Sequence, residues 1–205
     1  GTYAINLGTL SAGDNYTVNF TSANFTINAK SAAGLTIEAI DAQTFTGSAI
    51  TPSVVVKDGE TTLVAGTDYS LSFANNTNVG TATVTVTGTG NYTGTATANF
   101  TTTAKSAAGL TIEAIDAQTF TGSAITPSVV VKDGETTLVA GTDYSLSFAN
   151  NTNVGTATVT VTGTGNYTGT ATANFTITAA TLSITADAKT KVFGETDPTL
   201  TFTAT

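Results

Sequence analysis

The feature that most constrains this chain is an unchanged internal duplication. Residues 29–101 recur without a single difference as residues 104–176, so that Lys30 returns as Lys105. The match ends one residue later, where Thr102 corresponds to Ile177. Two adjacent domains with identical surfaces are poorly explained by a shared catalytic task. They are well explained by an array that provides length, reach or repeated display.

Within one copy, apolar and polar residues alternate with the two-residue period of half-buried strands. The strongest alternation predicts inward-facing side chains at Tyr69, Leu71, Phe73, Ala82, Val84, Val86, Ala96, Ala98 and Phe100. Weaker alternation predicts strands over residues 34–39, 50–57 and 62–64, with a hairpin turn at Asp58-Gly59. Six or seven short strands result, which favours an antiparallel two-sheet β-sandwich of the immunoglobulin-like kind.

Two smaller features refine this prediction. Pro52 has no N–H to donate, so its strand should lie at a sheet edge or contain a bulge. The joint between the copies, residues 100–109 (FTTTAKSAAG), contains a short segment of small residues, which is expected to bend but not to reach far.

Composition excludes several classes of function. The 205 residues include no Cys, Met, Trp or His, and the net charge is −8 with a calculated pI near 4.1. Nucleic acids and anionic membranes bind clustered Lys and Arg, so neither is expected as a partner. Without cysteine there is no disulfide framework. No apolar run is long enough for membrane insertion, and the acidity is typical of an exposed, extracellular or cell-surface bacterial protein.

The repeat resembles a known family in three stretches: FTGSAITP (45–52), the long run VKDGETTLVAGTDYSLSFANNTNVGTATVTVTGTGNYTG (56–94), and ATANFTI (171–177). These stretches are similar to the immunoglobulin-like repeats found in tandem in large bacterial surface and adhesin-like proteins. The resemblance covers the whole repeat twice and is most specific over residues 66–94. It implies a β-sandwich spacer, and it transfers no catalytic residue.

The two flanking segments resemble halves of one domain type, the MBG family of bacterial adhesin repeats. The C-terminal segment matches the opening of that family, at Asp187, Lys189 or Lys191, Phe193, Gly194, Glu195, Asp197 and Pro198. The N-terminal segment matches its close, at Gly1, Thr2, Tyr3, Gly8, Leu10, Asn15, Tyr16, Phe25 and Ile27. Phe193 departs from the tyrosine that is common there, and the family's middle segment is missing.

Neither half can bury enough apolar surface to fold alone. Each half is therefore expected to be disordered or to be completed by another segment. The expected partner is an adjacent copy of the same unit, with residues 181–205 of one copy meeting residues 1–28 of the next. The copies would be joined either along one long chain or between separate subunits by strand addition.

Candidate sites for chemistry are sparse. Glu38 with Asp41, and Asp58 with Glu60, are close in sequence, but carboxylates at strand ends and turns are usually solvated. The sequence predicts no enzyme, no catalytic residue, no cofactor-binding residue and no metal ligand. Calcium is the alternative cofactor, with oxygens offered by Asp68, Asn75, Asn76 and Asn78. Asn and Asp in loops more often bond their own backbone.

Four further readings concern modification and binding. An isopeptide bond could involve Lys30 or Lys57. Asn-x-Thr sequons occur at positions such as Asn15, Asn91 and Asn99. Threonine rows such as Thr81, Thr83, Thr85 and Thr87 suggest ice binding, but a twisted sandwich does not present a flat array. A carbohydrate module would use Tyr92 and Tyr167 for stacking.

The sequence therefore predicts four segments: residues 1–28 and 179–205 as partial MBG-like domains, and residues 29–103 and 104–178 as immunoglobulin-like repeats. The predicted function is a structural segment of a long extracellular bacterial adhesin stalk or surface fibre. The alternative is a filament subunit that polymerises by strand complementation between its terminal segments. A carbohydrate-binding module is the third candidate.

Overall fold

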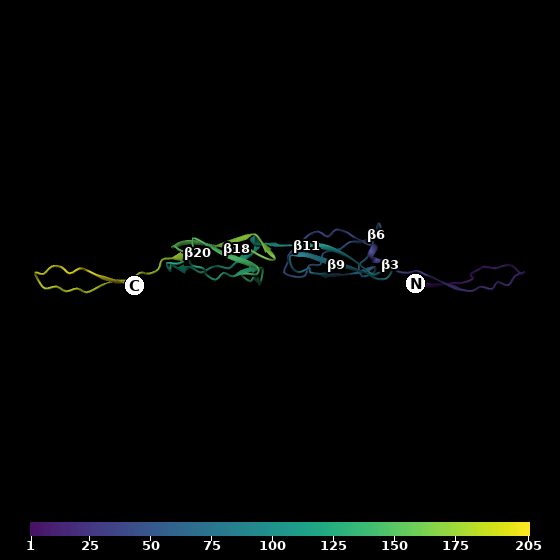
Figure 1. The fold of residues 1–205 in the computed structure, drawn as a ribbon, viewed down its shortest axis with the longest axis horizontal. Helices are drawn as coiled ribbons and strands as arrows, with labels where there is room; N and C mark the ends of the chain where they lie inside the picture. The colour runs from purple at the N-terminus through teal and green to yellow at the C-terminus, as the bar shows by residue number, and fades with distance from the viewer. The chain divides into compact units, whose positions relative to one another are not determined.

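The protein is described by a computed structural model that covers residues 1–205 (Figure 1). The predicted all-β class is confirmed, because 22 strands form the fold and the two 3-10 helices have three residues each. The chain divides into two compact units, Gly1–Ala104 and Lys105–Thr205. Each unit contains one copy of the repeat and one terminal hairpin, and each is described by itself below.

The larger sheet of the first repeat has four strands in the order β5-β11-β9-β8. Its strands are β5 (Gln43–Thr44), β8 (Tyr69–Ala74), β9 (Gly80–Gly88) and β11 (Thr95–Thr103). β9 pairs antiparallel with both β8 and β11, and Figure 1 shows β9 beside β11. β5 pairs parallel with the last two residues of β11. The three long strands, β8, β9 and β11, are those with the strongest alternation of apolar and polar residues in the sequence.

The smaller sheet has the order β4-β6-β7, and a separate two-stranded pair joins β3 to β10. Their bounds are β3 (Lys30–Ser31), β4 (Thr36–Ile37), β6 (Val56–Asp58), β7 (Thr61–Thr62) and β10 (Tyr92–Thr93). The 3-10 helix η1 (Ala32–Gly34) follows β3. Gly59 sits in the β6–β7 turn with φ of 59°, a conformation that glycine adopts without strain, as the Asp58-Gly59 pair predicts.

The core lies between these two sheets. Ala82, Val84 and Val86 from β9 are fully buried, and Val56 from β6 is equally buried opposite them. One cluster of buried residues contains Ala32, Leu35, Val56, Leu63, Tyr69 and Val86. Phe73 and Phe100 pack edge to face with ring centroids 6.3 Å apart. Each inward position predicted from alternation on these strands is buried or half-buried.

The second repeat has the same architecture, with a four-stranded sheet in the order β14-β20-β18-β17. Its elements are β12 (Lys105–Ser106), η2 (Ala107–Gly109), β13 (Thr111–Ile112), β14 (Gln118–Thr119), β15 (Val131–Asp133), β16 (Thr136–Thr137), β17 (Tyr144–Ala149), β18 (Gly155–Gly163), β19 (Tyr167–Thr168) and β20 (Thr170–Thr178).

The chain enters and leaves each repeat at opposite ends of the repeat's last strand. β3 pairs parallel with β10, which immediately precedes β11, whereas β5 pairs parallel with the final residues of β11. At about 3.3 Å per residue, the nine-residue strand β11 spans roughly 30 Å. The chain therefore enters each repeat near the start of this strand and leaves at its opposite end.

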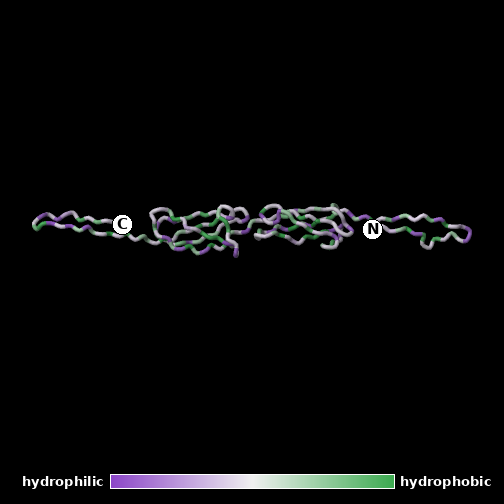
Figure 2. Tube along the Cα trace, turned by 90° about the horizontal axis from the view of Figure 1, so that it is seen from below, coloured by the Kyte–Doolittle hydropathy of each residue, from purple (hydrophilic) through white to green (hydrophobic).

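The terminal segments form two-stranded antiparallel hairpins. The first pairs β1 (Thr2–Ile5) with β2 (Ala23–Thr26), and the second pairs β21 (Ile184–Ala186) with β22 (Phe202–Ala204). Every residue of these four strands is exposed. Figure 2 shows hydrophobic and hydrophilic residues alternating along both hairpins.

Three details differ from the sequence prediction. Each repeat contains nine strands, because several two-residue strands have no detectable period. The predicted strand over residues 50–57 is wrong in its first half: only Val56–Asp58 is strand, and Pro52 lies in irregular chain before it. The joint is also shorter than expected, because only Ala104 separates β11 from β12.

Candidate functional site

The strand that opens each repeat is held by three polar side chains from three strands. Lys30 on β3 forms an ion pair with Asp58 on β6, with 2.6 Å between Nζ and Oδ1. The Tyr92 hydroxyl on β10 donates to the other carboxylate oxygen of Asp58 over 3.1 Å. The Lys30 backbone N–H also donates to the Asn91 carbonyl over 2.8 Å. We call Lys30, Asp58 and Tyr92 the entry triad of the first repeat.

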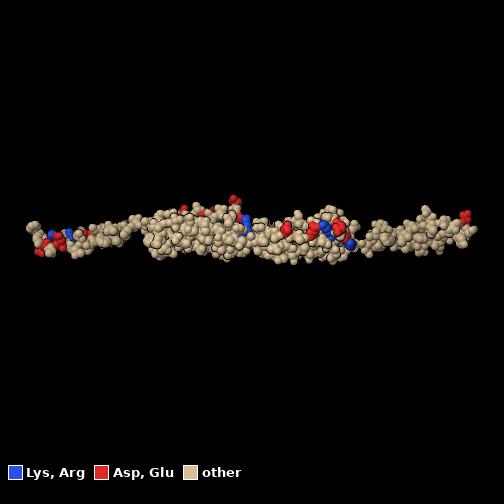
Figure 3. Space-filling view, turned by 90° about the horizontal axis from the view of Figure 1, so that it is seen from above, with Lys and Arg blue, Asp and Glu red and all other residues tan.

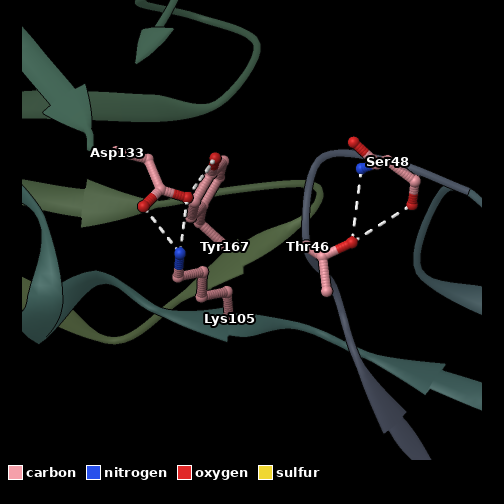
Figure 4. Close-up of polar contacts among 5 residues, drawn as sticks. All are labelled: Thr46, Ser48, Lys105, Asp133 and Tyr167. Carbon is pink, nitrogen blue, oxygen red and sulfur yellow. Dashed lines mark hydrogen bonds and ion pairs between the residues drawn. The ribbon is translucent and has the colours of Figure 1, made fainter. Parts of the chain in front are cut away.

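The entry triad of the second repeat consists of Lys105, Asp133 and Tyr167 (Figure 4). Lys105 Nζ lies 2.6 Å and 2.8 Å from the two oxygens of Asp133, and the Tyr167 hydroxyl donates to Oδ2 over 3.2 Å. Because Lys105 is the second residue after β11, this triad fixes the chain directly after the joint.

Glycine allows β10 to approach closely enough to supply the tyrosine. A Cβ built on Gly88 would lie 2.8 Å from the Thr93 nitrogen and 2.9 Å from the Tyr92 carbonyl carbon. No side chain fits there unless β10 moves. Gly163 stands in the same relation to β19 in the second repeat.

The electrostatics of the entry triad favour the charged forms of its lysine and aspartate. The hydrogen bond with Asp58 raises the pKa of Lys30, and the bond from Lys30 lowers the pKa of Asp58. Burial, followed by the charge of Asp133, raises the pKa of Tyr167 to about 12. Both members of the first pair are therefore held in their charged forms. Amide formation needs a neutral amine, so this geometry disfavours the isopeptide bond considered for Lys30.

The other lysine considered for an isopeptide bond, Lys57, forms an ion pair with Glu38. Lys132 and Glu113 repeat this pair in the second copy. Figure 3 shows that the charged side chains form small groups and that most of the visible surface is uncharged.

The strand that closes each repeat is held by parallel pairing with β5 or β14. In the first repeat, the Phe45 N–H donates to the Thr103 carbonyl over 2.8 Å, and the Thr103 hydroxyl donates to the Gln43 carbonyl over 3.1 Å. The second repeat reproduces this exit clamp with the same two distances: Phe120 donates to Thr178, and Thr178 donates to Gln118. The turn that follows β5 is closed by Thr46 and Ser48, where the Thr46 hydroxyl accepts from the Ser48 N–H over 3.3 Å and donates to its carbonyl over 3.2 Å (Figure 4).

The residue just before the exit clamp differs between the two repeats, and it is buried in both. Thr102 is 1% exposed, and its hydroxyl has no hydrogen-bond partner. Its counterpart Ile177 is equally buried and packs with Ile125, Ala157 and Phe175. An unpaired buried hydroxyl weakens folding by about 1–3 kcal/mol. The last strand is therefore expected to stabilise the second repeat more than the first.

The residues considered as calcium ligands do not all converge: Asn75, Asn76 and Asn78 line one surface hollow, but Asp68 lies at the other end of β8. Asp68 precedes β8 and accepts from the Val64 N–H over 2.9 Å, whereas Asn75 and Asn76 follow the other end of that six-residue strand. The Asn76 side chain donates to the Ile50 carbonyl over 2.9 Å, and Asn75 adopts a left-handed turn conformation with φ of 55°. No group of three or more His, Cys, Asp or Glu side chains is placed to hold a metal ion.

The tyrosines considered for sugar stacking are not exposed platforms. Tyr167 is buried at 6% exposure, Tyr92 is half-buried, and both hydroxyls bond aspartates of the entry triads. Among the carboxylates considered for acid-base work, Asp58 is engaged with Lys30 and Glu38 with Lys57, while Asp41 and Glu60 are exposed. Sequence reasoning named Lys30, Asp58 and Tyr92 separately but did not bring them together.

No protein-family model matches this chain, and no curated protein has a matching sequence. No helix of the structure is long and apolar enough to cross a lipid bilayer.

Proposed function

We propose that this chain is a non-catalytic structural segment of a long extracellular bacterial adhesin stalk or surface fibre, in which each repeat adds length and carries tension. The observation that carries this proposal is the path of the chain through each repeat. The chain enters beside the start of the last strand and leaves at its far end. A domain connected in this way contributes its long dimension to the fibre.

The joint supports the same role. Only Ala104 lies between the last strand of one copy and the first strand of the next, and the following residue, Lys105, already belongs to an entry triad. Nearly all of the chain is therefore folded into the repeats, and very little forms a linker. The acidic composition and the resemblance to tandem surface repeats supply the extracellular and bacterial part of the proposal.

The hydrogen bonds at both ends are arranged to resist pulling. β3 runs parallel to β10, and β5 runs parallel to the end of β11. When the two ends of a repeat are pulled apart, the paired strands slide lengthwise past each other, so the bonds of each pair must break together. Forced unfolding is governed by the barrier to this step.

The test is to measure length against copy number. Proteins with two, four and six copies of residues 29–103 between the native flanking segments should show a maximum dimension, by small-angle X-ray scattering, that grows linearly with copy number. Growth with the cube root of mass would contradict a spacer. Antibodies against the repeat should label intact cells of the producing bacterium, and labelling only after lysis would contradict the surface location.

The filament-subunit alternative is favoured by a separate observation, the exposed apolar side chains of the two terminal hairpins.

A further inference from the structure

The last strand of each repeat has one edge without a strand partner. On one side β11 pairs with β9 along nearly its whole length, but on the other side β5 reaches only Thr102 and Thr103. Between β3 and β5 the chain turns away from this edge, because β4 pairs with β6 of the other sheet. Residues 95–99 are therefore unpaired on this side, and residues 170–174 are their counterparts in the second repeat. We call these two stretches the open edges.

Backbone hydrogen-bonding groups point out of each open edge. The Phe45 N–H donates to the Thr103 carbonyl, so the backbone groups of Thr103 face the side of β5. Because backbone groups alternate in direction along a strand, those of Thr97 and Asn99 face the same side. They form no backbone hydrogen bond there. Natural edge strands are commonly protected by lysine, proline or a bulge, and the sequence TATAN of this edge contains neither lysine nor proline.

A largely apolar hollow lies beside each open edge. In the first repeat it measures about 380 Å³ and lies between Ala96 and Ala98 of β11 and the side chains of Leu35 and Ile37. The corresponding hollow of the second repeat measures about 390 Å³. An apolar cavity of about 150 Å³ holds one benzene-sized group, so each hollow has room for two large side chains.

The N-terminal hairpin contains a segment that lacks the same kinds of partner. Residues 16–20 belong to no strand, and no backbone hydrogen bond joins residues 17–22 to the rest of the chain. Tyr16, Val18 and Phe20 alternate with polar residues, so an extended segment presents them on one side. These side chains are 75%, 36% and 40% exposed. We call residues 16–20 the free segment.

We propose that the free segment of one copy adds to an open edge of a second copy, as an extra strand of its four-stranded sheet. The two stretches have five residues each, and their unbonded backbone groups pair with each other. Val18 and a neighbouring aromatic ring fill the hollow beside Ala96 and Ala98. Neither stretch carries a charged side chain, so the contact desolvates no charge within them.

Three other pairings satisfy fewer of these groups. Two free segments paired with each other form a two-stranded ribbon without a second layer, which is marginally stable. Two open edges paired with each other place alanine beside alanine and leave both hollows unfilled. The paired strands of the terminal hairpins have only three or four residues each, so they are shorter than an open edge.

The contact is small, so association should be weak and should depend on concentration. Five residues on each side bury less than the roughly 1,200 Å² of a standard interface. Each chain has one free segment and two open edges, so it donates once and accepts twice. In an array with many copies, such contacts act together. This inference concerns contacts between copies, and it depends on the proposed spacer role only for its place in a fibre.

The first experiment measures sedimentation of the full chain between about 1 and 500 μM. The native chain should associate as its concentration rises. Two variants should each associate at least about tenfold more weakly: Val18→Asp, which places a charge on the free segment, and the double variant Thr97→Pro with Thr172→Pro, which removes one N–H from each open edge. A mixture of the two variants should form complexes again, with up to two proline-variant chains on each Val18→Asp chain.

Control variants separate this contact from a general loss of apolar surface or of folding. Leu10→Asp and Phe202→Asp change exposed apolar side chains outside the free segment and should associate like the native chain. The double variant Thr97→Ala with Thr172→Ala keeps both N–H groups and should also associate like the native chain. The proline variant should keep the melting transitions of the native chain, because the outward N–H groups make no bond within the sheet.

Four outcomes of this experiment would overturn the proposal. The native chain would remain monomeric over the whole range. Val18→Asp alone would associate like the native chain, which would show that open edges pair with each other. The proline variant alone would do so, which would show that free segments pair with each other. Leu10→Asp or Phe202→Asp would abolish association, which would place the contact elsewhere.

A second experiment uses cross-linking and leaves the free segment apolar. The chain has no cysteine, so single cysteines report contacts cleanly. With Val18 facing the hollow, either Thr17 or Asn19 lies directly opposite Thr97, about 5 Å away between Cβ atoms, whichever way the added strand runs. After mild oxidation, Thr97→Cys mixed with Thr17→Cys or with Asn19→Cys should give the mixed disulfide dimer in at least one case.

The matched control for cross-linking is Thr85→Cys. Thr85 lies opposite Thr97 on β9, one strand farther from the added segment and beyond the reach of a disulfide. Equal yields with Thr85→Cys and Thr97→Cys would overturn the proposal. With Val18→Asp in every protein of the copy-number series, the maximum dimension should still grow linearly, so the spacer role and this contact can fail separately.

Discussion

The two repeats have the same residues over 29–101 and 104–176, yet they close their last strand differently. In the first copy the position after this block is Thr102, a buried hydroxyl without a partner, and in the second it is Ile177, packed in an apolar cluster. All surrounding residues up to that point are identical. One residue at the edge of a duplicated sequence therefore separates two otherwise equal domains, and the second repeat is expected to be the more stable.

The largest effect is expected from Ile177→Thr, which gives the second repeat the residue of the first. The variant loses buried apolar contacts and gains an unpaired hydroxyl, so the free energy of unfolding of that repeat should fall by about 2–3 kcal/mol. In calorimetry the native chain should show two transitions, and this variant should show them merged at the lower temperature. If the two transition temperatures stayed as far apart as in the native chain, Ile177 would not be the cause of the difference in stability.

A smaller and opposite effect is expected from Thr102→Val in the first repeat. Valine has nearly the shape of threonine and removes only the orphan hydroxyl, so this repeat should gain about 1 kcal/mol of unfolding free energy. For a domain of this size, the lower melting temperature should rise by about 4–8 °C. The matched control is Thr101→Val, whose side chain is exposed and should change the transition little. A decrease in stability for Thr102→Val would show that the hydroxyl has a stabilising role.

At alkaline pH the second repeat should lose stability. The pKa of Tyr167 is raised to about 12 in the folded state, from its ordinary value of 10.0. Below pH 10 the phenol is protonated in both the folded and the unfolded chain, and its contribution is complete. Between pH 10 and 12 the unfolded chain releases this proton more readily, so stability falls. Denaturant unfolding across this pH range should show a loss of unfolding free energy in the native chain and a weaker loss in Tyr167→Phe. Identical pH profiles for the two chains would contradict a role for the Tyr167 proton.

The smallest effect is expected at acid pH in the first repeat. The pKa of Asp58 is lowered by its bond from Lys30, so the ion pair stabilises the fold above the ordinary carboxyl value of 3.8 and is lost as the pH falls through the folded value. In the Asp58→Asn variant, the melting temperature of the first repeat should depend less on pH below about 4 than it does in the native chain. Asp41→Asn, at an exposed carboxyl outside the triad, is the control and should leave the profile as it is.

Long alternation made much of the fold predictable. Strands β8, β9 and β11 and their inward residues follow from the two-residue period, and the β6–β7 turn follows from Asp58-Gly59. The two-residue strands β3, β5 and β10 carry no period, so their parallel pairing depends on tertiary packing alone. The segment before Val56 has strand-forming residues but remains irregular around Pro52.

The polar sites were only partly predictable. Lys30, Asp58 and Tyr92 meet because three separate strands converge, and no local pattern encodes that meeting. The burial of Thr102 could have been found, because alternation through Ala98 and Phe100 places the next inward side chain at residue 102. The hairpin faces were likewise visible as alternation, but which strands pair, and which residues therefore share a face, required the register.

We propose each repeat as a tension-bearing spacer closed at both ends by parallel strand pairs. Single-molecule pulling on the full chain, held beyond both hairpins, tests this role. Two discrete unfolding events are predicted, each lengthening the chain by about 23 nm as residues 30–103 or 105–178 extend. The repeat with Thr102 should break first, and Thr102→Ile should make the two forces equal. Smooth extension without discrete events, or one event of double length, would contradict the account.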